Sequence, residues 1–270
     1  MIPDTHSITS VISRRRALAV LAGGATAFLA ACSNNSKAAS TTTPGPTDTT
    51  AATDTSAPTT SGTTDCPPVV PEETAGPFPG DGSNGPDVLS DPASVRRDIT
   101  TSFGDYTGTA TGVPTTIEIT VLNSSTCAPM QGAAVYVWHA DKDGHYSMYT
   151  APEANYLRGV GATDANGTVA FDSIWPGCYD GRWPHIHFEV YPSLADAAAA
   201  ANIITTSQIA LPEPDCATVY AADGYATSAT NLTHTSLASD MVFRDGWDQE
   251  LGTATGSNAA GWTVGLTISV

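Results

Sequence analysis

The segment G-C-Y-D-G-R-W-P-H-I-H-F-E-V-Y, residues 177–191, ends in a pattern that decides the fold. Strand side chains point alternately to opposite faces. One face here carries Ile186, Phe188 and Val190, and the other carries His185, His187 and Glu189. The apolar face predicts a strand packed on a core, and two imidazoles on the other face can converge on one ion at about 2.0–2.1 Å per nitrogen. The segment therefore predicts a metal site, although His-x-His alone is equally compatible with two hydrogen-bonded structural histidines.

Short alternating segments dominate the chain after residue 65 and predict further strands at residues 116–121, 133–138, 168–171 and 262–270. Turn signals such as D-A-N-G at residues 164–167 separate them. An Ala-rich run at residues 194–202, preceded by Ser193, predicts a short helix, and a further turn is expected near residues 217–221. We therefore expect an all-β domain at residues 66–270, an antiparallel β-sandwich or barrel with short helices.

The first residues have the pattern of an export signal. Three arginines at residues 14–16 precede an apolar run at residues 17–31, which favours a twin-arginine signal peptide at residues 1–31. The letters L-A-A-C at residues 29–32 resemble a lipoprotein cleavage box, so Cys32 is the predicted lipidation site. We expect an exported, extracytoplasmic protein whose only membrane contact is a lipid anchor at Cys32.

Residues 32–65 are rich in Thr, Ser and Pro and have hardly any large apolar side chain. Such a segment cannot bury enough surface to offset the entropy of ordering, so a disordered tether is predicted. An O-glycosylated stalk is the alternative that this composition also allows. The net charge of the whole chain, −17, argues against nucleic acid as a partner, because phosphate binding needs a basic surface.

Four cysteines remain once Cys32 is assigned to lipid. An even number in an oxidising compartment predicts two disulfides, and three pairings are possible. We favour Cys66 with Cys127 and Cys178 with Cys216. A thiolate metal ligand at Cys178, which would suit zinc, is the alternative, but as the neighbour of Tyr179 in an extended segment Cys178 should point the other way.

Five segments together resemble the intradiol ring-cleavage dioxygenases, most closely their exported, single-domain members. They are T-A-G-P-F at 74–78, V-W-H-A-D at 137–141, D-G-H-Y-S at 143–147, Y-L-R-G at 156–159 and the segment 177–188. The resemblance implies one non-haem Fe(III), a small aromatic diol and O2 as substrates, and a muconate-type dicarboxylic acid as product. It covers about residues 70–270.

The metal ligands implied by the resemblance are Tyr146, Tyr179, His185 and His187. Phenolate oxygen is a hard donor, so this set suits Fe(III) better than Zn(II) and differs from the two-His-one-carboxylate site of ferrous oxygenases. The family also implies that Tyr179 leaves the metal and accepts a substrate proton. A turn position for each tyrosine is the alternative when either is considered alone.

Arg182 matches the active-site arginine of the family, where a permanent positive charge stabilises developing negative charge. A structural salt bridge is the alternative. Pro77 and Phe78 match a loop that lines the substrate pocket, and a plain turn is the alternative there. Arg158 belongs to the resemblance without a role that the sequence defines.

Two other classes of function remain as hypotheses. The first is a non-catalytic exported β-sandwich binding module with a vestigial metal site. The second is a zinc hydrolase that uses His185 and His187, which leaves both tyrosines without a purpose.

Overall fold

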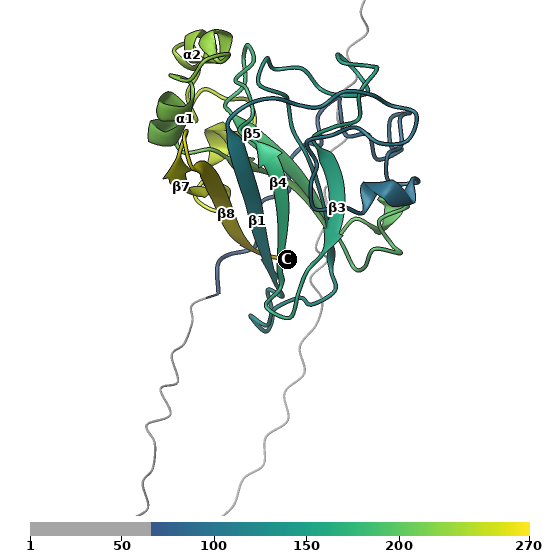
Figure 1. Cartoon of the computed structure of the whole chain (residues 1–270). Coiled ribbons are helices and arrows are strands. Elements are labelled where there is room, and N and C mark those ends of the chain that lie inside the picture. The colour runs from purple at the N-terminus through teal and green to yellow at the C-terminus, as the bar shows by residue number, and fades with distance from the viewer. Residues whose placement is uncertain (1–65) are drawn as a thin grey trace, which may run out of the picture. The chain divides into compact units, whose positions relative to one another are not determined.

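Two four-stranded sheets form the core of residues 66–270, which are the residues that this computed structural model describes. Figure 1 shows β8, β1 and β4 side by side in one of these layers. The predicted signal peptide at residues 1–31, the predicted tether at residues 32–65 and the predicted lipidation site Cys32 lie outside the described residues.

The first sheet has the strand order β4-β1-β8-β7 and the second has the order β3-β2-β5-β6. The strands are β1 (Pro114–Leu122), β2 (Ala134–Trp138), β3 (Arg158–Ala162), β4 (Thr168–Ile174), β5 (His185–Tyr191), β6 (Thr205–Ala210), β7 (Thr253–Ser257) and β8 (Gly261–Ser269). The helices are η1 (Pro92–Ser94), η2 (Ala200–Asn202), α1 (Glu213–Val219), α2 (Ala226–Leu232) and η3 (Phe243–Asp245).

The main core lies between the two sheets. Strand β5 contributes the predicted apolar face, and β1 contributes Ile117, Ile119 and Val121, all of them fully buried. Phe188 lies opposite Val137 of the neighbouring strand β2. Each such side chain contributes about 1.5–3 kcal/mol when it is buried, so this face fixes the position of β5.

The predicted sandwich is confirmed, with one difference in strand direction. Strands β1 and β8 run parallel, whereas the other pairs are antiparallel. Parallel neighbours need a long connection, and here the whole second sheet is threaded between β1 and β8. Strand pairing within residues 66–270 leaves the two sheets separate, so the barrel alternative is not adopted.

The helix predicted at residues 194–202 is wrong. This segment forms turns and then only η2, because Ala197 is the one residue of 194–202 that is buried and could hold a helix in place. Short helices without tertiary packing are marginal. The turn expected near residues 217–221 falls at the end of α1, and α2 follows it. No helix within residues 66–270 combines the length and apolar character needed to cross a membrane.

One of the two predicted disulfides is formed. Cys66 is joined to Cys127, which ties the start of the described chain to the loop after β1. Cys178 and Cys216 are free, buried thiols, so the second predicted pairing is wrong for this structure. Both pack in the core between the sheets, where a thiol acts as a small apolar group.

The outer face of the second sheet is covered by loops rather than by another sheet. A second apolar cluster fills this space, with Tyr136 and Trp138 of β2, Tyr191 of β5, and Phe78 and Tyr146 of the loops. The polar face of β5 therefore lies beneath loops that come from distant parts of the chain. That arrangement places the predicted metal ligands in a buried but polar space.

Candidate metal centre

Strand β5 presents His185 and His187 on its outer face, and each is only 3% exposed. The Nδ1 of His185 lies 2.5 Å from the carbonyl oxygen of Trp183, so it carries the proton and donates it. The Nε2 of His185 is then left with a free lone pair. A metal-binding histidine is typically held this way by a backbone carbonyl.

The ring of His187 stacks on Trp138, with ring centroids 4.7 Å apart and planes inclined by 5°. Trp138 is the β2 residue directly opposite His187, so the register of the two strands sets this contact. A Cβ added to Gly76 would lie 3.5 Å from Cε1 of His187, so the loop that contains Gly76 closes over the ring. The strand register and this loop together fix the direction of Nε2.

Tyr146 enters the site from the loop between β2 and β3. Its backbone amide donates to the Thr150 hydroxyl at 2.7 Å, and the ring of Phe78 packs on its ring at 4.9 Å between centroids. The side chain is 2% exposed. Tyr146 is therefore held from both its backbone and its ring.

Tyr179 is held by the segment around it. The backbone of Cys178 donates to the Ser228 hydroxyl at 3.0 Å and accepts from the Asn231 side-chain amide at 2.8 Å, so α2 anchors this turn. Gly144 approaches from the other side, with φ +86° and room for no side chain, because an added Cβ would lie 2.9 Å from the Cβ of Tyr179. Tyr179 is only half-buried, in contrast to the other three residues.

The four predicted ligand residues converge on one point. The Nε2 of His185 lies 3.1 Å from the Nε2 of His187, 3.2 Å from the phenol oxygen of Tyr146 and 3.3 Å from that of Tyr179. The two phenol oxygens are 3.5 Å apart. Donor atoms bonded to one ion at about 2.0–2.1 Å are separated by about these distances. The donor set therefore fits a single metal ion.

Burial sets the protonation of these groups in the absence of a cation. Burial, with Arg182 next, lowers the pKa of His185 to about 3, and burial lowers the pKa of His187 well below its usual value. Both imidazoles are neutral, and a neutral His187 can donate an Nε2–H to the Nε2 lone pair of His185 at 3.1 Å, whereas a bound cation would take the lone pair of each Nε2.

Burial also raises the pKa of the Tyr146 phenol well above its ordinary value and raises that of Tyr179. Arg182 acts in the opposite direction on both phenols. A multiply charged cation reverses the effect of burial and favours the phenolates. The site therefore needs a cation before two phenolates can exist there.

No group of three or more His, Cys, Asp or Glu side chains with metal-binding geometry occurs among residues 66–270. The convergent set has two histidines and two tyrosines, and it brings no carboxylate to the point where the donors meet. Zinc sites are usually built from Cys, His and carboxylates, whereas phenolate oxygen is a hard donor that suits a ferric ion. The residues present fit Fe(III).

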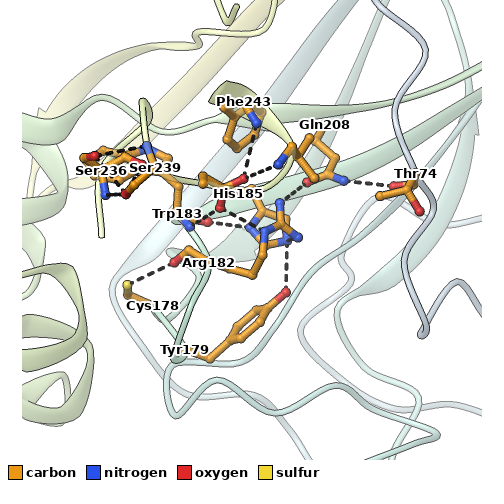
Figure 2. A network of polar contacts seen from close by, with 12 residues as sticks. Thr74, Cys178, Tyr179, Arg182, Trp183, His185, Gln208, Ser236, Ser239 and Phe243 are labelled. Atoms are coloured by element: carbon orange, nitrogen blue, oxygen red, sulfur yellow. Dashed lines mark hydrogen bonds and ion pairs between the residues drawn. The ribbon is translucent and has the colours of Figure 1, made fainter. Parts of the chain in front are cut away.

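Arg182 is the cation beside this point. Its Nη1 lies 3.4 Å from the Nε2 of His185, its Nε donates to the Asp240 carboxylate at 2.9 Å, and its Nη2 donates to the Gln208 side-chain oxygen at 2.6 Å. Gln208 in turn donates to the carbonyl of Thr74 at 2.8 Å. Figure 2 shows this network from Tyr179 through His185, Arg182 and Gln208 to Thr74. Arg182 thus has both a structural salt bridge and a free edge toward the ligands.

The predicted pocket residues lie at one edge of the site. Phe78 is half-buried and contacts the ring of Tyr146, whereas Pro77 is exposed. Cys178, the alternative thiolate ligand, directs its sulfur to the carbonyl of Arg182 at 3.5 Å and away from the donor atoms. Phe78 is therefore part of the site, and Cys178 is not.

Residues 84–205 match the family model described as Dioxygenase. Among solved structures, an intradiol ring-cleavage dioxygenase from Tetranychus urticae is 24% identical, with a TM-score of 0.57 over 74% of this chain and 93% of that chain. The chain resembles the intradiol ring-cleavage dioxygenases in sequence and in fold. That predicted resemblance is confirmed.

Two further dioxygenase structures are less similar. The dioxygenase domain of a dioxygenase carbohydrate-binding protein fusion from Streptomyces sp. SirexAA-E is 23% identical, with a TM-score of 0.47 over 74% of this chain and 96% of that chain. Hydroxyquinol 1,2-dioxygenase from Pseudomonas putida DLL-E4 is 16% identical, with a TM-score of 0.46 over 75% of this chain and 66% of that chain. No curated protein sequence matches the chain.

Three residues of this site were missed by the sequence interpretation. Gln208 and Asp240 hold Arg182, and Trp138 stacks on His187. Trp138 lies within a quoted motif, and its partnership with His187 follows from pairing the predicted strands. Gln208 and Asp240 carry no local signal, because they reach Arg182 from 26 and 58 residues away along the chain.

Proposed function

We propose that this protein is an intradiol dioxygenase. It holds one non-haem Fe(III) on Tyr146, Tyr179, His185 and His187 and inserts both atoms of O2 into a catechol-type diol, which gives a muconate-type dicarboxylic acid. The observation that supports this most directly is that two phenol oxygens and the Nε2 of His187 all lie within 3.1–3.3 Å of the Nε2 of His185, with the two phenol oxygens 3.5 Å apart.

Ferric iron, when bound, would draw electron density from a chelated diol and make its ring open to direct attack by O2. The protein has to keep the ion ferric, and two hard phenolate donors favour that state. A buried, largely dry site also strengthens every charge interaction within it.

Tyr179 is suited to exchange a ligand position for a proton. It is the half-buried member of the four and belongs to a turn, whereas His185 and His187 are fixed in a strand. Its phenol oxygen can leave the ligand set and hold a proton from the incoming diol. Tyr146, buried under Phe78, stays in place.

Arg182 and Phe78 have different roles toward the substrate in the proposed reaction. The guanidinium of Arg182 has a permanent charge beside His185 and stabilises negative charge on the diol oxygens and ring. Gln208 and Asp240 hold its orientation. The ring of Phe78 supplies an apolar wall that suits an aromatic substrate and excludes water.

We also propose that the protein is exported and lipid-anchored through Cys32, as the first residues predict. The Cys66–Cys127 disulfide supports an oxidising compartment. Labelling of the expressed full chain with a fatty-acid analogue tests the anchor. Label on the wild type and its loss in Cys32→Ser are expected, and equal label on both would contradict the anchor.

Ring cleavage under ¹⁸O2 tests the reaction itself. The iron-loaded protein should convert catechol to a dicarboxylic acid that contains both labelled atoms, as measured by mass spectrometry. Tyr146→Phe should lose this activity, whereas Tyr106→Phe, at an exposed tyrosine 38% accessible, should keep it. A protein that binds iron and diol but forms no product would favour the non-catalytic binding module. An iron-loaded protein that cleaves no diol, together with a hydrolytic activity that depends on zinc, would favour the zinc hydrolase.

A further inference from the structure

Arg158 is a buried arginine without an acidic partner. Its side chain is 1% exposed, and no carboxylate within residues 66–270 forms a salt bridge with it. Burial of a charge without a counter-ion costs several kcal/mol unless hydrogen bonds satisfy it. The contacts that Arg158 makes therefore indicate what it is for.

All five N–H groups of Arg158 are used, each toward a neutral oxygen. Its Nε donates to the Ser147 hydroxyl at 3.0 Å and one Nη2 bond goes to the Ser147 carbonyl at 2.9 Å. The other Nη2 bond reaches the carbonyl of Phe78 at 2.9 Å. The Nη1 bonds reach the carbonyl of Pro79 at 2.7 Å and the hydroxyl of Tyr136 at 3.1 Å.

The segment Pro77, Phe78, Pro79 needs such contacts. Its two prolines have no backbone N–H, so the segment cannot be held by a strand ladder. Its carbonyls are held one by one instead. That of Pro77 accepts from the Asn84 side chain at 2.9 Å, that of Phe78 from Arg158, and that of Pro79 from Arg158 and from Tyr136 at 2.7 Å.

Two of the residues that Arg158 contacts, Ser147 and Phe78, adjoin Tyr146. Ser147 is the next residue along the chain, and the ring of Phe78 packs on the ring of Tyr146 at 4.9 Å. An added Cβ at Gly80 would lie 2.8 Å from Nη1 of Arg158, so the segment passes closely over the guanidinium. Arg158 thus joins a backbone neighbour of Tyr146 to the residue that covers its ring.

We propose that Arg158 is a positioning residue, which fixes the Pro77–Phe78–Pro79 segment as the wall of the substrate site and holds Tyr146 in its ligand position. The expected change in KM for catechol rests on the proposed function. Lysine cannot replace arginine here, because a planar fork with five donors is needed to reach acceptors on three segments.

The test compares Arg158→Met with Ile117→Ala. Ile117 is a control for lost stability, because it is fully buried in the core between the sheets and lies in the other sheet, on β1. Both variants should lose stability. Hydrogen exchange at the Gly80 amide, which donates to the Tyr149 hydroxyl at 2.9 Å, reports on the segment in iron-free protein.

In Arg158→Met, we expect the Gly80 amide hydrogen to exchange at least about tenfold faster. The tyrosinate absorption of the iron-loaded variant should shift or weaken. Its KM for catechol should rise by about tenfold, which corresponds to about 1.4 kcal/mol. Ile117→Ala should change none of these, although it lowers Tm. Arg158→Lys should restore little of the Gly80 protection, and it carries the same test if Arg158→Met does not fold.

Equal Gly80 exchange, absorption and KM in the Arg158→Met and Ile117→Ala variants would overturn the proposal and leave Arg158 a purely stabilising residue. The failure of the proposed function looks different. In that case the iron-loaded wild type would show no tyrosinate absorption and no diol cleavage, while the exchange of Gly80 would still decide whether Arg158 holds the segment.

Discussion

The two faces of β5 are both buried, but they are buried by different kinds of structure. The core face packs Ile186, Phe188 and Val190 against the other sheet, and each is 0% exposed. The outer face carries His185 and His187, at 3% exposed each, under loops. Apolar side chains need only a volume to fill, whereas each buried polar atom needs a partner of its own. The difference explains why the site requires residues from many segments.

Substitution of one residue on each face of β5 should give the largest difference between an effect on stability and an effect on metal binding. His187→Ala removes a metal ligand, while the protein should still fold. Loss of a residue that only hydrogen-bonds a metal ligand lowers metal affinity by roughly 10–100-fold, so His187→Ala should lower the affinity for iron by more than this. Phe188→Ala should lower the free energy of unfolding by about 3–5 kcal/mol and leave the iron content of the folded fraction unchanged. Metal analysis and denaturant titration measure the two effects. Loss of iron in both variants alike would show that the faces are not independent.

The buried ion pair of Arg182 and Asp240 should be the next most sensitive feature. Asp240 is 0% exposed and accepts from the backbone N–H of Trp183 at 2.6 Å as well as from Arg182. Asp240→Asn would leave a buried positive charge unpaired and should cost about 3–5 kcal/mol. The exposed pair of Arg97 and Asp172 is the control, and Asp172→Asn should cost about 0–1 kcal/mol. Similar losses in the free energy of unfolding of Asp240→Asn and Asp172→Asn would contradict the claim that burial makes the Arg182–Asp240 pair the more sensitive one.

Glu250 is a polar exception beside the core face. It is 0% exposed, and burial, with the nearby Glu73, raises its pKa to about 8 from 4.5. The folded state then binds more protons than the unfolded state between these two values, so stability should fall as pH rises from about 4.5 to 8. Glu250→Gln, which can still accept from the Ser207 hydroxyl, should flatten this dependence. A wild-type Tm that rises across this range, with no change in slope in the variant, would contradict it.

The smallest expected effect concerns the chemical reactivity of the Cys178 and Cys216 thiols. They are free in the core between the sheets, whereas Cys66 and Cys127 are joined. Unfolded residues 66–270 should therefore expose 2 titratable thiols before reduction. Native protein should react slowly, because both thiols are buried and burial raises the pKa of Cys178 to about 12. No titratable thiols after unfolding would restore the second disulfide predicted from the sequence.

The parts of the site that lie on one strand were predictable from the sequence. Alternation placed His185 and His187 on one face, and the family resemblance supplied Tyr146 and Tyr179, which the structure brings to the same point. The core strands were predictable for the same reason, since period-two patterns are local. The parallel pairing of β1 with β8 was not, because strand order depends on the whole chain.

The supports of the site could not be predicted, because they depend on contacts between distant positions. Arg158 reaches Phe78 across 80 residues, and Arg182 reaches Asp240 across 58. Both arginines lie within segments that carry the family resemblance, but the local sequence does not show which distant residues each of them contacts. The free thiols of Cys178 and Cys216 show the same limit, since an even number of cysteines does not reveal which pairs meet.

The central claim is that four side chains from β5 and two loops bind one ferric ion. Visible absorption during titration of the metal-free protein with Fe(III), followed by anaerobic addition of catechol, tests it most directly. We predict a tyrosinate band that saturates at one iron per chain, shifts with catechol and weakens in Tyr146→Phe. A protein that binds no iron, or binds it without a tyrosinate band, would contradict the account.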